Sequence, residues 1–266
     1  SFCHITKAKA QKTVFRHGDF FQDQDMRIVI PTLCALAAAT ATLAERTVEQ
    51  NCSAAVAENA EDARDAAARW ISLGGGVPAR LCEAEALVAL GANRLAAVKL
   101  TELATAQQFA MDNPLRAEIL TDATRLWLTL GEAKLAEETA SLAASLSGSK
   151  RDALPLLASA LAAQDRWEEV DAIVSLLVEE RPGPMLFALG ARANRSLGAP
   201  EAALSYADAA LTMDAEHAEA LFERASALQI LGDVDAARQT ATTFLQFHPR
   251  HPRANAITGI LFGEAR

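Results

Sequence analysis

The sequence predicts an all-α solenoid of helix hairpins, and three observations lead to this prediction. The chain has 266 residues, of which 51% are hydrophobic but only 5% aromatic, a composition typical of closely packed helices rather than sheets. A Leu-Gly turn signal returns at a nearly constant interval. Small residues stand at fixed distances on both sides of that signal. A fixed period of this kind is the sequence mark of helical repeat arrays.

The turn signal defines five blocks, and the clearest reads LGAPEAALSYADAAL from Leu197. We take the glycine of each block as its key position; in one block an aspartate replaces it. The spacings between key positions are 40, 34, 33 and 34 residues, so the first unit carries a six-residue insertion, near AQQFAMDNPLR (106–116). The key positions are Gly91, Gly131, Asp165, Gly198 and Gly232.

Small residues flank every key position in register. Such residues let the two helices of a hairpin approach closely, and positions −7 and −4 share one helix face. Proline follows seventeen residues after two key positions, at Pro182 and Pro249, where it ends the unit. At −7 stand Ala84, Thr124, Ala158, Ala191 and Ala225, and at +5 stand Ala96, Ala136, Val170, Ala203 and Ala237.

This spacing resembles that of tetratricopeptide repeat (TPR) proteins, whose unit is a 34-residue helix–turn–helix. The resemblance covers residues 77–251, although the usual tyrosine two residues after the glycine appears only as Trp167. It implies a right-handed superhelical solenoid of about five hairpins between capping helices. It also implies a non-catalytic scaffold that binds a protein or peptide in a concave groove lined by the first helices.

The two ends of the chain have other compositions. Met26-Arg27 precedes seventeen uncharged residues, IVIPTLCALAAATATLA, as in a secretory signal. A short helix and then a longer one are predicted for residues 52–73, CSAAVAENAEDARDAAARWISL. The GGG that follows is typical of the end of a helix. We therefore expect an upstream or disordered leader (1–25), a signal peptide (26–44), an N-terminal helical cap (46–76), the repeats (77–251) and a C-terminal capping helix (252–266).

Removal of a signal peptide on export would leave an acidic protein outside the cytoplasm. Without residues 1–44 the chain keeps 20 basic and 31 acidic residues, a formal charge of −11. A domain with this much negative charge is repelled by nucleic acid and by anionic membrane surfaces, so we expect it to bind neither. We expect a periplasmic or secreted protein of the bacterial cell envelope. If 28–44 is retained instead, the alternative is a cytoplasmic or inner-membrane-tethered adaptor.

Two cysteines remain after removal of the leader and signal, which hold Cys3 and Cys34. An even pair in an exported domain predicts a disulfide between Cys52 and Cys82. It would tie the cap to the first repeat. The alternative is a pair of buried free thiols.

No motif for catalysis or cofactor binding is present in the sequence: it has no P-loop, HExxH, nucleophile elbow or Rossmann glycine pattern. His248 and His251 lie in FHPRHPRA without further metal ligands nearby, so we expect a solvated turn there. We predict no enzyme activity, no catalytic residue, no cofactor and no metal. The remaining alternative is an accessory module of an enzyme complex.

The predicted groove is a stripe at −10, −6 and −3 from each key position, since these offsets share a helix face. Arg125, Arg192 and Arg195 on this stripe can hold carboxylates bidentately, which predicts an extended peptide with acidic side chains or a free C-terminus. The alternative is surface arginine paired with neighbouring acids. The Lys/Asn pattern of carboxylate-clamp TPRs is absent. The candidate groove residues are Glu85, Arg125, Ser159, Arg192, Arg195, Phe222, Ser226 and Gln229.

Overall fold

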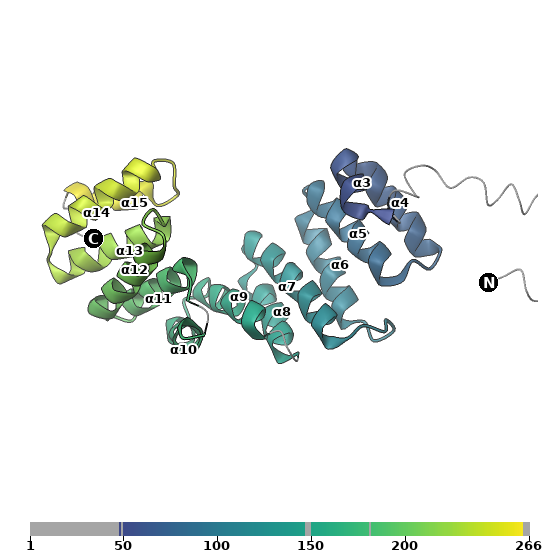
Figure 1. Ribbon diagram of the computed structural model, residues 1–266, viewed down its shortest axis with the longest axis horizontal. Helices are drawn as coiled ribbons and strands as arrows, with labels where there is room; N and C mark the ends of the chain where they lie inside the picture. The colour runs from purple at the N-terminus through teal and green to yellow at the C-terminus, as the bar shows by residue number, and fades with distance from the viewer. Residues whose placement is uncertain (1–47, 49, 147–149, 181, 263–266) are drawn as a thin grey trace, which may run out of the picture. The chain divides into compact units, whose positions relative to one another are not determined.

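The computed structural model describes residues 48, 50–146, 150–180 and 182–262. Within these ranges all regular structure is helical, with no strand (Figure 1). The predicted leader and signal peptide, residues 1–25 and 26–44, lie outside the described residues. So do the last four residues of the predicted closing helix.

The described helices form a cap, five hairpins and a closing helix. The cap is α3 (Cys52–Glu58) and α4 (Ala60–Ser72), and the closing helix is α15 (Ala254–Phe262). The hairpins are α5 (Gly76–Ala89) with α6 (Asn93–Thr105), α7 (Asn113–Thr129) with α8 (Ala133–Ser145), α9 (Lys150–Ala162) with α10 (Trp167–Val178), α11 (Pro184–Ser196) with α12 (Pro200–Met213), and α13 (Ala218–Leu231) with α14 (Val234–Phe247).

Successive helices pack against each other along the whole array, and the first helices of neighbouring hairpins also meet. Direct contacts join α7 to α9, α9 to α11, α11 to α13 and α13 to α15. The second helices make their main contacts with their chain neighbours alone. From α7 onward the first helices therefore form one continuous layer. All the predicted groove residues except Glu85, which is on α5, lie on this layer.

The turn inside each hairpin has the backbone that the key position predicts. The four glycines have φ between 74° and 84°, and Asp165 has φ 55°. Glycine adopts this left-handed conformation without the steric cost that a Cβ imposes. At Gly198 the turn is closed by backbone hydrogen bonds from Gly198 to Arg195 (3.1 Å) and from Ala199 to Asn194 (2.9 Å).

The small-residue rows form the packed seam of each hairpin. Every residue at −7 and +5 is at most 2% exposed, which confirms the prediction. Thr124, the hydroxyl in this row, donates to the Leu120 carbonyl and lies 2.8 Å from the Thr139 hydroxyl, so its polar atom is satisfied. At the end of the array, Ile257 and Ile260 are buried over the last hairpin, as expected of a closing helix.

The cap is fixed by side-chain capping and by a cysteine pair. Asn59 accepts hydrogen bonds from the backbone of Glu61 and Asp62 and so starts α4 directly after α3 ends. Cys52 and Cys82 lie at disulfide distance, with Cα atoms 5.6 Å apart. That separation lies within the range of native disulfides. In the described part of the chain, no helix has both the length and the apolar character needed to span a membrane.

Candidate functional site

The eight predicted groove residues fall on successive first helices: Glu85 on α5, Arg125 on α7, Ser159 on α9, Arg192 and Arg195 on α11, and Phe222, Ser226 and Gln229 on α13. Two cavities take in six of them. Ser159 and Arg192 line a cavity of about 270 Å³ between α9, α11 and α13, here named the Arg192 pocket. The other four line a cavity of about 690 Å³ between α11, α13 and α15, here named the C-terminal cavity.

Arg192 provides an uncommitted cation in its pocket. Its guanidinium stacks over the Trp167 ring at 4.8 Å, and within the described ranges no carboxylate lies at ion-pairing distance from it. Burial, and next the nearby charge of Arg253, lower the pKa of Arg192. The charges of Glu223 and Glu219 offset this effect in part without pairing with Arg192. A carboxylate bound directly to the partly desolvated guanidinium would stabilise it further.

Apolar and polar groups share the wall of the Arg192 pocket. Met185 is 74% exposed, and Leu189 lies beside it. His217 caps α13 by accepting a hydrogen bond at Nδ1 from the Ala220 backbone. A neutral His217 therefore carries its proton on Nε2, where it remains a donor. The carboxylate of Glu219 also lines the pocket, but Arg253 lies 3.3 Å from it and supplies its counter-charge. The pocket thus combines a cation, a ring donor and an apolar wall, a mixture suited to an extended peptide.

Arg195 is engaged within the protein. Its Nε lies 2.6 Å from the carboxylate of Glu223, which is fully buried. Arg253 contacts the same carboxylate at 2.9 Å. Arg195, which was predicted to contact the peptide, therefore belongs to an ion network that joins α11, α13 and the segment before α15. It also lines the C-terminal cavity.

The wall of the C-terminal cavity includes the polar side chains of Arg195, Ser226 and Gln229. Arg253 lies over the Phe222 ring at 4.5 Å, and Ser226 donates to the Phe222 carbonyl at 2.9 Å. Phe262 on α15 is 74% exposed beside the cavity. The cavity continues the layer of first helices to the end of the array.

The other two predicted residues line neither cavity. Glu85 is exposed on α5. Arg125 pairs with Asp122 on its own helix at 2.6 Å, with both side chains more than half exposed. Arg125 thus forms a surface ion pair with a neighbouring acid, which was the alternative to its binding a peptide.

The turn with His248 and His251 is solvated in part, as expected: Pro249, Arg250 and Pro252 are exposed, whereas the two histidines pack against the protein. Both rings are partly buried and lie 5.7 and 5.3 Å from the ring of Phe244. Phe244 is fully buried at the end of α14, so the imidazoles cover its apolar edge. Within the described ranges no group of three or more His, Cys, Asp or Glu residues is placed to hold a metal ion.

Sequence reasoning missed Trp167 as the platform of Arg192 and Glu223 as the partner of Arg195. A signal for the second was present. Position −3 is apolar in the first three units and becomes Arg195 in the fourth. A charged residue that follows three apolar ones in the same row calls for a nearby counter-charge. Glu223, at −9 of the following unit, supplies it.

Comparisons with known proteins identify the class of fold. No family model and no curated protein matches the chain. Among solved structures, a thermophilic TPR protein from Thermus thermophilus is 18% identical over 69% of this chain and 97% of its own, with a TM-score of 0.53. The C-terminal part of a TPR protein from Cytophaga hutchinsonii is 14% identical over 86% of this chain and 92% of its own, with a TM-score of 0.60.

A third structure adds a described function. YrrB, described as a TPR protein with an unusual peptide-binding site, is 16% identical over 79% of this chain and 98% of its own, with a TM-score of 0.54. At such identities the likeness is one of fold. The chain has the TPR fold, an all-α repeat solenoid, as the resemblance implied.

Proposed function

We propose that the protein is a non-catalytic TPR scaffold that binds a partner protein through an extended acidic segment. The segment lies along the first helices and places a carboxylate on Arg192. The observation that carries the proposal is the guanidinium of Arg192, which is half-buried on Trp167 and forms no ion pair with any described residue. The peptide-binding site described for YrrB supports the use of this fold for such recognition.

The carboxylate is either an acidic side chain or the free C-terminus of the partner. A guanidinium presents two parallel donors to a carboxylate, and the Trp167 ring restricts its orientation before binding. Neighbouring side chains of the partner lie against Met185 and Leu189. Binding should therefore weaken with salt, because the exposed part of the contact is screened.

Quantitative affinity capture tests this proposal. The Arg192→Ala variant should retain less than a tenth of the partner that the parent protein captures, at equal protein and salt concentrations. Arg125→Ala is the matched control, since it removes an arginine of the same stripe that is paired on its own helix. Equal loss in both variants, or none in Arg192→Ala, would place recognition elsewhere. Arg195 is unsuitable for this test because its loss leaves Glu223 short of a partner.

We further propose that the protein is exported to the periplasm. The apolar run at 28–44 and the Cys52–Cys82 pair support this location. Expressed from Met26 in a bacterium, the protein should appear in the periplasm with an N-terminus near Thr42 or Glu45. Recovery in the cytosol with Met26 intact would contradict export and favour the cytoplasmic adaptor; an intact chain in the membrane fraction would favour the tethered one.

A further inference from the structure

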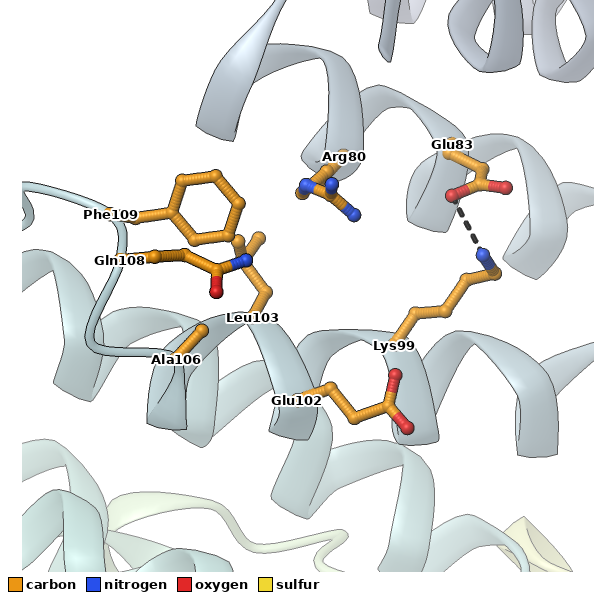
Figure 2. Close-up of a pocket in the computed structure, with 8 residues that line it drawn as sticks. All are labelled: Arg80, Glu83, Lys99, Glu102, Leu103, Ala106, Gln108 and Phe109. Atoms are coloured by element: carbon orange, nitrogen blue, oxygen red, sulfur yellow. Dashed lines mark hydrogen bonds and ion pairs between the residues drawn. The ribbon is translucent and has the colours of Figure 1, made fainter. Parts of the chain in front are cut away.

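The six-residue insertion after the first hairpin forms one wall of a separate pocket. The segment 106–112 between α6 and α7 lies against α5 and α6 and encloses about 190 Å³ with them (Figure 2). Pockets for drug-sized ligands have about 300–1,000 Å³, so this one fits a molecule of few heavy atoms. None of its lining residues belongs to the Arg192 pocket or the C-terminal cavity.

The insertion is held in place by its own contacts. Arg116 on α7 donates to the carbonyls of Ala104 (2.5 Å), Ala106 (3.2 Å) and Phe109 (3.1 Å). Phe109 and Met111 pack against the core of the first two hairpins. The segment that forms the pocket wall is therefore anchored by contacts within the protein itself.

Arg80 is the unsatisfied group of this pocket. Its guanidinium lies over the Phe109 ring at 5.0 Å. Its Nε is buried and, within the described ranges, has no hydrogen-bond acceptor. The second cation, Lys99, is 2.9 Å from Glu83 and so already has its counter-charge. Because the buried Nε is closed to a ligand, an acceptor in the pocket would meet the terminal nitrogens of Arg80, which in the described part of the chain form no ion pair.

Glu102 is the corresponding unmatched anion. In the described part of the chain its carboxylate has no ion pair, and it is exposed at the solvent side of the pocket. Figure 2 shows it on the opposite side of the pocket from Arg80. A simple anion would be attracted by Arg80 but repelled by Glu102. A small molecule with one negative and one positive end complements both.

We propose that this pocket binds a free α-amino acid, with its carboxylate on Arg80 and its ammonium group on Glu102. Its side chain lies towards Phe109 and Leu103, the apolar part of the lining. The site is independent of the peptide groove. It assigns a function to the unit that carries the six-residue insertion.

The purified protein is tested against each of the twenty standard L-amino acids by thermal shift, and hits are measured by calorimetry. At least one should raise Tm and bind. Its N-acetyl and its amide derivatives should each bind at least tenfold more weakly, because each removes one charge. Arg80→Gln and Glu102→Gln should each weaken binding at least tenfold. Arg94→Gln, which removes an arginine of α6 that pairs with Glu132 outside the pocket, should bind as the parent does.

The contradicting outcomes are equally concrete. The absence of binding by all twenty amino acids overturns the proposal. Equal binding of the N-acetyl derivative means that the pocket recognises a carboxylate alone, such as a side chain of a partner protein, and also overturns it. The derivatives test the site even if a variant fails to fold. Arg192→Ala should bind the amino acid as the parent does, so this proposal and the proposed scaffold function fail separately.

Discussion

The Nε of Arg195 lies 2.6 Å from a carboxylate oxygen of Glu223, whose side chain is fully buried. The two residues stand on the adjacent first helices α11 and α13, and Arg253 reaches the same carboxylate from the segment before α15. A buried carboxylate is tolerated only when charged donors surround it. This contact therefore joins two repeats and the closing helix through one charge.

Arg195→Ala should lower the free energy of unfolding by about 1.5–3 kcal/mol, the range for hydrogen bonds to charged groups, since Glu223 would keep only Arg253. Arg125→Ala removes an exposed pair and should change it by less than about 0.5 kcal/mol. Urea unfolding followed by circular dichroism measures both. An equally small effect in the two variants would mean that the Glu223 contact adds no stability.

Asp165→Gly should stabilise the protein by about 0.5–1 kcal/mol, because Asp165 adopts a left-handed φ of 55° that glycine accepts more readily. Gly198→Ala should destabilise it by about 1 kcal/mol. A Cβ at Gly198 meets no atom within 4 Å, so the loss of stability would measure only the strain of placing alanine in the left-handed backbone conformation. Thermal melts of the two variants test the pair. A fall in Tm for Asp165→Gly would mean that the aspartate side chain stabilises its turn.

The Cys52–Cys82 pair should form a disulfide in the exported protein. Non-reducing mass spectrometry should find the two cysteines protected from alkylation and the protein two protons lighter than its reduced form. A bridge across 30 residues stabilises by roughly 3–4 kcal/mol through the entropy of loop closure. The Cys52→Ala/Cys82→Ala variant should be less stable by about that amount. Free alkylation without reductant would refute the bridge.

Glu137 should make stability depend on pH. A hydrogen bond from Gln164, and then one from Arg166, hold the pKa of Glu137 below its ordinary value. The stabilisation is complete above the unfolded-state pKa of about 4.3 and is lost as pH falls through the lower folded-state value. At pH 7 the free energy of unfolding should therefore be larger for the parent than for Glu137→Gln, and the difference should become smaller as the pH is lowered. A margin that stays constant with pH would contradict this assignment.

The fold was predictable from the sequence because its seams are local and periodic. Ala191 and Ala203 stand at fixed distances from Gly198, and hairpin packing requires small residues at both places. The candidate site was predictable only as a stripe. Whether an arginine on it is free depends on side chains from other units, such as Glu223, which lies 28 residues from Arg195. Repeat periodicity can mark an arginine that breaks its row, as at Arg195, but it does not identify the partner.

Site-specific photo-crosslinking tests the central claim, that the layer of first helices holds the partner, most directly. A photoreactive residue replaces Met185, 74% exposed in the Arg192 pocket, or Leu142, 41% exposed on the second helix α8. When each labelled protein is mixed with the partner and irradiated, we predict a crosslinked product from position 185 and little from position 142. Adding Arg192→Ala to the protein labelled at position 185 should reduce its product at least tenfold. Crosslinking that is strong at position 142 and absent at position 185 would place the partner on the second helices and contradict the account.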